Sequence, residues 1–234
     1  MIIDEPQIAT APQFIMAEDV RFLHRIISIR YLTHDTFIMR LEKKHLQFVA
    51  GQHIKLRIPG NKKSREYSVY NAENDNFIEL LIKEVNEGYL TPLLKRRKEG
   101  EYLELRGPSG SFVLKSSDIK SKKFLFIASG TGISPFHSYV ASNPELDYTI
   151  LHGIRYSHEA YDKSFYDSSR YIACTTGDAD SEYFGRVTKY LSENDLDNDM
   201  LVYLCGNYNM IVDSMEILKS KGFSRDQIFI ESYF

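Results

Sequence analysis

The sequence predicts two domains of different class, an antiparallel β-barrel or sandwich followed by a doubly wound α/β domain. The hydrophobic pattern changes part-way along the 234 residues. In the first half, short runs that alternate between apolar and polar residues are separated by turn signals, as in half-buried antiparallel strands. In the second half, continuous apolar runs alternate with helical patterns, as in parallel strands buried on both faces.

The first half contains four clear strand candidates. Turn signals such as Pro59-Gly60 separate them, and one helix is expected over residues 90–98, where Pro92 is tolerated only in the first turn. The predicted strands cover residues 36–41, 54–58, 77–82 and 101–105.

The second half contains five apolar runs, and the clearest helix is predicted over residues 208–221, with Gly222 as its stop. The polar stretch 115–122 separates the two hydrophobic patterns. We therefore expect one domain over residues 1–118, of which 1–20 form an N-terminal extension, and another over residues 119–234. The predicted buried strands cover residues 124–128, 148–151, 171–174, 201–205 and 228–230.

Composition excludes several classes of protein. No apolar run approaches the ~18 residues of a membrane span, and Asp4 and Glu5 stand where an export signal would be positive. We therefore expect a cytoplasmic protein without a membrane span. Two cysteines are too few for an iron–sulfur site, and the seven histidines lack metal-ligand spacing, so no metal is predicted.

Charge is distributed unevenly between the two halves. The net charge of -3 argues against nucleic-acid binding, but residues 1–120 hold 19 Lys+Arg and 16 Asp+Glu. This surplus of three positive charges indicates an acidic partner for the first half. The basic run 95–98 could contribute to such a surface, although basic residues also suit the last turn of a helix, which we favour.

Two short motifs carry the chemistry. Gly130-Thr131-Gly132 follows a buried strand and precedes a helix, which suits a pyrophosphate held by backbone N–H groups. Pro135 stands where the common dinucleotide fingerprint has its third glycine, so a plain strand–helix turn is the alternative. In the β half, Arg65 can neutralise a diphosphate and Tyr67 can stack on a flat ring, or both can belong to an ordinary strand.

Five motifs in a fixed order resemble the ferredoxin–NADP reductase family of flavoproteins. They are Arg65-x-Tyr67-Ser68, Gly88-x-x-Thr91, the glycine motif at 130–135, Cys205-Gly206-Asn207 and the terminal Glu231-Ser232-Tyr233-Phe234. The resemblance extends from about residue 21 to 234. It implies a six-stranded antiparallel barrel that binds FAD and an α/β domain that binds NADPH or NADH.

On the FAD side, the resemblance implies that Arg65 pairs with the pyrophosphate, that Tyr67 stacks on the isoalloxazine and that Ser68 lies near flavin N5. Tyr233 would cover the ring face at which nicotinamide arrives. An ordinary solvated lysine is an equal alternative for Lys83. The residues expected at FAD are Arg65, Tyr67, Ser68, Lys83, Gly88, Leu90, Thr91, Tyr233 and Phe234.

On the nucleotide side, Arg155 and Arg186 favour NADPH, since a guanidinium matches a phosphate. Many NADPH-using members have a Ser-Arg pair where this chain has Thr175-Thr176, so the match is incomplete. Ser68, Cys205 and Glu231 match the family's catalytic group. The residues expected at NAD(P) are Gly130, Thr131, Gly132, Arg155, Thr175, Thr176, Arg186, Cys205, Gly206 and Asn207.

The leading functional hypothesis is an FAD-dependent oxidoreductase, expected as a monomer, that exchanges a hydride with NAD(P)H and single electrons with a separate acidic ferredoxin or flavodoxin. One alternative is an NAD(P)H-dependent reductase of free flavin, quinone or ferric chelates. The other is a non-catalytic flavin-binding electron-transfer subunit.

Overall fold

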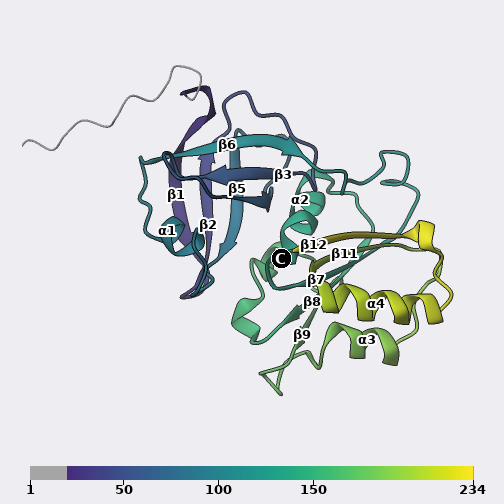
Figure 1. The fold of residues 1–234 in the computed structure, drawn as a ribbon. Coiled ribbons are helices and arrows are strands. Elements are labelled where there is room, and N and C mark those ends of the chain that lie inside the picture. The colour runs from purple at the N-terminus through teal and green to yellow at the C-terminus, as the bar shows by residue number, and fades with distance from the viewer. Residues whose placement is uncertain (1–19, 234) are drawn as a thin grey trace, which may run out of the picture.

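The computed structural model describes residues 20–233 and contains two six-stranded sheets side by side (Figure 1). The predicted extension, apart from Val20, and Phe234 lie outside the described residues. A single turn of 3-10 helix, Val20–Phe22, leads into the first sheet. The predicted two-domain architecture is confirmed, with the antiparallel sheet first and the parallel sheet second.

The first sheet closes into a barrel. Its strands follow the order β4-β3-β6-β1-β2-β5, and each neighbouring pair is antiparallel. A bridge between Val69, just after β4, and Leu80 of β5 joins the two outer strands. The strands are β1 (Leu23–Tyr31), β2 (Thr36–Glu42), β3 (His53–Arg57), β4 (Ser64–Ser68), β5 (Phe77–Lys83) and β6 (Tyr102–Ser109).

The barrel interior follows the alternation of the sequence. In β3, Ile54 and Leu56 are fully buried while Lys55 between them is exposed. The helix α1 (Thr91–Lys95) places Leu94 in the same interior cluster. This helix is shorter than the predicted 90–98, because the chain turns back at Gly100, whose N–H donates to the carbonyl of Ile26 in β1.

The second sheet is parallel and has the order β10-β9-β8-β7-β11-β12. The strand order reverses at β7, the first strand of this domain, because β8 to β10 follow on one side of it and β11 and β12 on the other. Its strands are β7 (Phe124–Ser129), β8 (Tyr148–Ile154), β9 (Tyr171–Thr175), β10 (Tyr183–Phe184), β11 (Leu201–Asn207) and β12 (Ile228–Tyr233).

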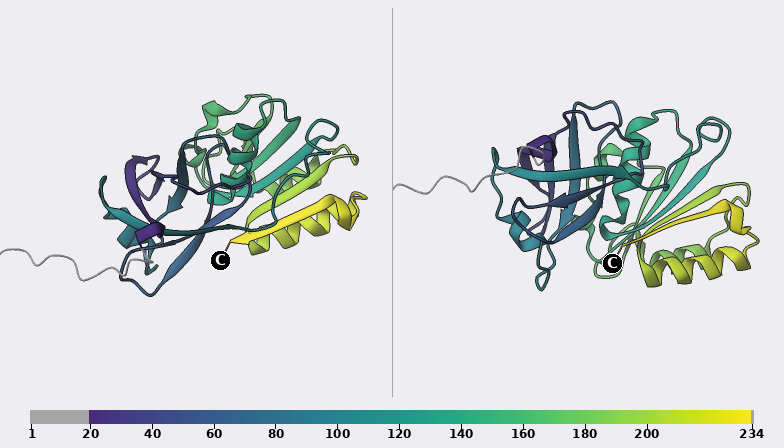
Figure 2. Two further views of the ribbon diagram at one scale, coloured as in Figure 1. Left: turned by 90° about the horizontal axis from the view of Figure 1, so that it is seen from above. Right: turned by 45° about the horizontal axis from the view of Figure 1, so that its top comes forward.

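Helices cover both faces of this sheet. Figures 1 and 2 show α3 and α4 together along one face and α2 on the other, toward the barrel. The α-helices are α2 (Ser134–Ser142), α3 (Val187–Glu193) and α4 (Tyr208–Ser220). Short 3-10 turns lie at Gly130–Ile133, Ser157–Glu159, Lys163–Phe165 and Arg225–Gln227.

The continuous apolar run of β7 supplies both faces. Phe124 and Phe126 belong to the cluster on the α2 side, whereas Leu125 and Ile127 belong to the cluster under α3 and α4. Burial of both faces therefore explains why β7 lacks the alternation seen in β3.

The two domains share a core. The cluster on the α2 side also contains Ile38, Tyr70 and Leu81 of the barrel half and Phe112 of the connecting segment. The Tyr139 hydroxyl of α2 donates to the carbonyl of Phe112 at 2.5 Å. The barrel therefore packs directly on α2, and the C-terminal end of β12 lies between the domains in every view (Figure 2).

Candidate functional site

The largest gathering of predicted site residues lines a cavity of about 770 Å³ between the barrel and the α/β domain, which we call the flavin cavity. The β-barrel, the loop before α1, the turn after β7 and the end of β12 all contribute to its wall. The predicted residues that line it are Arg65, Tyr67, Ser68, Lys83, Gly88, Leu90, Thr91, Thr131, Glu231 and Tyr233.

Strand β4 presents three of these side chains from the outer part of the barrel sheet. Ser68 is buried, and burial raises the pKa of the Tyr67 phenol above its usual value. The Arg65 side chain is exposed and donates to the carbonyl of Ser64 at 2.9 Å. No carboxylate within residues 20–233 forms an ion pair with Arg65, so its guanidinium can still bind an anion.

The loop before α1 forms a tight backbone turn at the cavity wall. Its Gly88 N–H donates to the carbonyl of Val85 at 2.7 Å, and a Cβ at Gly88 would lie 2.8 Å from that oxygen. The Thr91 hydroxyl accepts from the N–H of Val85 at 2.9 Å. Glycine is therefore required sterically here, and Thr91 holds the loop while its hydroxyl proton can still be donated to a ligand.

Lys83 reaches the cavity, but its charge is engaged across the domain interface. Its Nζ donates to Glu159 Oε1 at 2.7 Å and lies 3.6 Å from Asp35 Oδ2. Burial works to lower the pKa of Lys83, but the bond to Glu159 and the negative charges of Glu159 and Asp35 together outweigh it, and the net shift is upward. Glu159 also accepts the N–H groups of Arg155 and Tyr156, so Lys83 connects the flavin cavity to the end of β8.

The three predicted catalytic residues converge from three strands. Tyr233 donates its hydroxyl proton to Ser68 Oγ at 2.7 Å, and Ser68 donates to Glu231 Oε2 at 3.2 Å. Cys205 is fully buried beside them and pairs with Glu231 in the register of β11 and β12. Burial raises the pKa of the Cys205 thiol and of the Glu231 carboxyl, and the network is therefore biased toward protonated groups.

His53 belongs to this network although sequence analysis did not single it out. Its Nδ1 lies 3.6 Å from Glu231 Oε1 and its Nε2 lies 3.7 Å from Glu66 Oε2. A lone histidine at a strand start carries no motif. Only the pairing of β3 with β4, which places His53 opposite Ser68, reveals the contact.

The glycine turn after β7 lies against the end of β11. A Cβ at Gly132 would fall 2.3 Å from the carbonyl oxygen of Cys205, and one at Gly206 would fall 2.4 Å from Ser129 Oγ. Only glycine permits these two strand ends to come so close. Since carboxyl ends of parallel strands meet at the reversal of strand order, this is where open α/β sheets bind ligands.

A buried histidine supports the same turn. His152 of β8 donates from Nε2 to the carbonyl of Gly130 at 2.7 Å, while its Nδ1 accepts from the Tyr171 hydroxyl at 2.6 Å. Burial lowers the pKa of His152 to about 4, although the bond to Gly130 opposes the shift. The neutral ring therefore fixes the orientation of the glycine loop.

The remaining predicted nucleotide residues lie along the same sheet edge, outside the flavin cavity. Arg155 follows β8, Thr176 follows β9 and Arg186 precedes α3, and the side chains of Thr176 and Arg186 are exposed. Thr175 is buried and its hydroxyl is bonded to the carbonyl of Asp178. Asn207 caps α4 by accepting from the N–H of Asn209 at 2.9 Å. Thr175 and Asn207 therefore use their side-chain oxygens within the fold.

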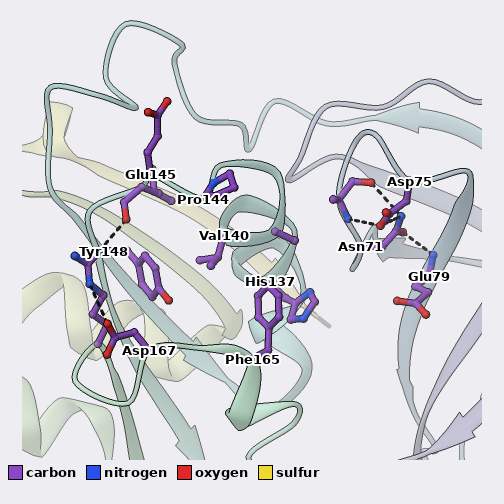
Figure 3. Close-up of a pocket in the computed structure, with 14 residues that line it drawn as sticks. Asn71, Asp75, Glu79, His137, Val140, Pro144, Glu145, Tyr148, Phe165 and Asp167 are labelled. Atoms are coloured by element: carbon purple, nitrogen blue, oxygen red, sulfur yellow. Dashed lines mark hydrogen bonds and ion pairs between the residues drawn. The ribbon is translucent and has the colours of Figure 1, made fainter.

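A second cavity of similar volume opens on another side of the domain interface (Figure 3). Its wall includes Asp75, which accepts from Asn71 at 3.1 Å, and Glu79, which pairs with Arg40 at 2.9 Å. Arg170 donates to the carbonyl of Leu146. None of the predicted site residues within 20–233 lines this second cavity, and these charged groups already have partners within the protein.

No helix within residues 20–233 is long and apolar enough to span a membrane. Across the same residues, no group of three His, Cys, Asp or Glu side chains is placed to hold a metal ion.

Two known protein families match this chain. Residues 24–114 match the oxidoreductase FAD-binding domain, and residues 126–216 match the oxidoreductase NAD-binding domain. The chain belongs to the ferredoxin–NADP reductase family. It therefore combines an FAD-binding barrel with an NAD-binding α/β domain, as the order of its motifs predicts.

Curated relatives are components of larger systems. The chain is 26% identical over 226 residues to the toluate 1,2-dioxygenase electron transfer component of Pseudomonas putida, covering 89% of this chain and 66% of the relative. It is 27% identical over 240 residues to the propane 2-monooxygenase reductase component of Rhodococcus jostii, covering 92% and 64%. The chain thus spans slightly less than two thirds of the length of these relatives.

Solved structures share the fold. A ferredoxin NADP+ reductase from Neisseria gonorrhoeae with bound FAD and NADP superposes with a TM-score of 0.82 at 21% identity, covering 91% of this chain and 98% of that one. A cytochrome P450 reductase from Amycolatopsis gives a TM-score of 0.81 at 24% identity, covering 89% and 68%.

Proposed function

We propose that this protein oxidises NAD(P)H through FAD and passes single electrons to a separate acidic carrier such as a ferredoxin or flavodoxin. The observation that carries the proposal is that Ser68 and Glu231 meet at the flavin cavity from two domains, with the buried Cys205 paired with Glu231 on the neighbouring strand. A cavity used for packing alone does not need a hydroxyl, a thiol and a carboxyl at one point.

The residues of the flavin cavity fit FAD. An unpaired arginine and a glycine turn suit a pyrophosphate, and the aromatic ring of Tyr67 beside a buried hydroxyl suits a flat heterocycle. When bound, FAD supplies the conversion of a two-electron hydride into single electrons. Arg65, Gly88, Leu90 and Thr91 would hold the pyrophosphate, while Tyr67, Ser68 and Tyr233 would contact the ring system. The call on Phe234 stays a prediction.

The nucleotide residues would hold the coenzyme at the adjoining sheet edge. Gly130, Thr131 and Gly132 would bind its pyrophosphate, and Cys205 and Gly206 would border the nicotinamide. Arg155 and Arg186 would face a 2′-phosphate, whereas Thr176 offers only a hydroxyl. We infer use of both coenzymes with a modest preference for NADPH.

The acidic carrier is inferred from charge. Residues 1–120 carry three more basic than acidic side chains, and Lys55, Arg65 and the exposed Lys63 lie at or near the flavin cavity. A positive surface steers an acidic partner toward the cavity and loses this effect as salt screens it.

The test is turnover of the purified protein. We expect FAD in the preparation and NAD(P)H-dependent reduction of ferredoxin or flavodoxin that slows with added salt. Faster reduction of free flavin, quinone or ferric chelate, without salt dependence, would favour the reductase alternative. A protein that binds FAD but does not oxidise NAD(P)H with ferricyanide would be an electron-transfer subunit without catalysis.

A further inference from the structure

His53 lies between a partly buried and an exposed carboxylate. One ring nitrogen faces Glu231 Oε1 at 3.6 Å and the other faces Glu66 Oε2 at 3.7 Å. The Glu231 side chain is 19% exposed, whereas that of Glu66 is 54% exposed. The imidazole thus connects the interior of the flavin cavity to solvent.

The barrel holds the ring in this place. Strand β3 lies between β4 and β6, so His53 is paired with Ser68 on one side and with Ser109 on the other. Ser109 Oγ lies 3.0 Å from His53 Nε2. Gly110 leaves room for the ring, because a Cβ there would lie 2.9 Å from Nδ1. The strand pairing of His53 and the absence of a side chain at Gly110 together hold the imidazole between Glu231 and Glu66.

The proposed reaction requires a path for one proton. Oxidation of one NAD(P)H by two single-electron acceptors yields NAD(P)+, two reduced acceptors and one proton. Within the cavity, Ser68 already donates to Glu231 and can pass a proton outward if another arrives on its oxygen. From Glu231, which is mostly buried, the proton still has to reach water.

We propose that His53 is the positioning residue that carries protons between Glu231 and solvent, with Glu66 as the outer acceptor. Imidazole is suited to this because it accepts a proton at one nitrogen and releases one from the other. The charged groups that face it are Glu231 from β12 and Glu66 from β4, and Lys55 pairs with Glu66 at 3.4 Å. The direction in which the proton moves rests on the proposed function. The electrostatic coupling between His53 and Glu231 is independent of that function.

The coupling is tested without turnover. Glutamate carboxyl carbons are labelled with 13C in the protein as purified, and Glu231→Gln identifies the Glu231 signal. In His53→Ala we expect the Glu231 transition to move to higher pH than in the parent protein, because a positive neighbour that holds the pKa of Glu231 down is lost. His34→Asn, at an exposed histidine outside the site, should leave the signal unchanged.

The relay is tested by chemical rescue. With ferricyanide as acceptor, His53→Ala should lower kcat at least about tenfold, at the low end of general acid–base contributions, and added imidazole should restore part of the loss. The restored rate should follow the pKa of substituted imidazoles. Glu66→Gln, at an exposed position, should lower kcat less and preserve FAD content.

Three outcomes overturn the proposal. The first is an unchanged Glu231 titration in His53→Ala, and the second is a loss of kcat that no imidazole restores. The third, if His53→Ala does not fold, is a Glu66→Gln protein whose pH profile matches the parent. Absence of NAD(P)H oxidation in the parent would refute the proposed function and the proton relay, while the titration would still decide whether His53 and Glu231 are coupled.

Discussion

Two cavities of similar volume lie between the same two domains, yet they differ in what their polar groups do. In the second cavity, Asp75 and Glu79 are bonded to Asn71 and Arg40. In the flavin cavity, Arg65 is exposed without a carboxylate partner among residues 20–233, and glycines take the place of side chains. The ability of a cavity to bind a charged ligand therefore depends on charged side chains that have no ion-pair partner within the protein. The volume of the cavity does not reveal it.

The difference has an electrostatic counterpart. His137 at the second cavity is stacked on Tyr70 with ring centroids 3.8 Å apart, and its Nδ1 donates to the Tyr70 carbonyl at 2.7 Å. Burial lowers its pKa to about 4, so it stays neutral and serves the domain interface. Glu231 at the flavin cavity is also shifted toward neutrality, but it lies among groups that can exchange its proton.

The largest expected effect concerns acid stability at the second cavity. Because the folded pKa of His137 lies below its ordinary value of 6.5, the unfolded chain binds the extra proton first. The free energy of unfolding should therefore fall as pH drops from 6.5 toward 4, by on the order of 3 kcal/mol for this group. Urea unfolding across that range should show a shallower pH slope in His137→Phe. An identical slope would show that His137 does not control acid sensitivity.

The next effect concerns FAD. Arg65→Ala removes charge-assisted bonds worth roughly 1.5–3 kcal/mol, so FAD affinity should fall about ten- to a hundredfold. Equilibrium dialysis of FAD measures this. Arg170→Ala in the second cavity is the matched control and should retain FAD fully. If the two variants bind FAD equally well, the assignment of the pyrophosphate to Arg65 is wrong.

A smaller effect concerns Tyr233, which we expect to cover the flavin ring. Tyr233→Ser with Phe234 deleted removes stacking of about 0.5–1.5 kcal/mol and the bond to Ser68 Oγ. We expect tighter nicotinamide binding, a higher kcat/KM with NADH and a changed flavin absorbance spectrum. Phe165→Ser, at an aromatic residue of the second cavity, should change none of these. Unaltered absorbance and NADH kinetics in the truncated variant would leave Tyr233 as packing only.

The smallest effect concerns coenzyme choice at the sheet edge. Thr176→Arg adds a guanidinium beside the expected 2′-phosphate and should raise the ratio of kcat/KM for NADPH over NADH several-fold, since a charged hydrogen bond contributes about 1.5–3 kcal/mol before screening. Ser192→Arg on the exposed side of α3 adds the same charge elsewhere and should leave the ratio unchanged. Equal ratios in the two variants would mean that the 2′-phosphate lies elsewhere.

Much of the fold could be predicted because periodicity is a local property. Alternation in residues 54–58 and the continuous run at 124–128 each report how many faces of a strand are buried. The motif residues of the flavin cavity were likewise found one by one, since Arg65, Tyr67 and Ser68 stand together in the chain. Their assembly with Glu231 depended on the resemblance, because no local pattern brings β4 beside β12.

The contacts that escaped prediction join residues far apart in the chain. His53 has meaning only opposite Ser68 and Ser109. Lys83 was a predicted site residue, but its partner Glu159 lies 76 residues later. The place of Asn207 at the coenzyme stays a prediction, and the same side chain caps α4. The cap had a local signal, since asparagine just before a helical pattern is a preferred N-cap.

The shared aromatic core has a consequence for motion. Interfaces inside a chain usually allow domains to swing unless the contact is large and apolar. Here Tyr139 of α2 is bonded to Phe112 of the connecting segment, and Tyr70 of the barrel half stacks on His137 of α2 with ring centroids 3.8 Å apart. Separation of the two domains would expose this shared apolar core to water. We therefore expect the proposed coenzyme to enter by rotation of the Tyr233 ring, which we place over the flavin, without a hinge between the domains.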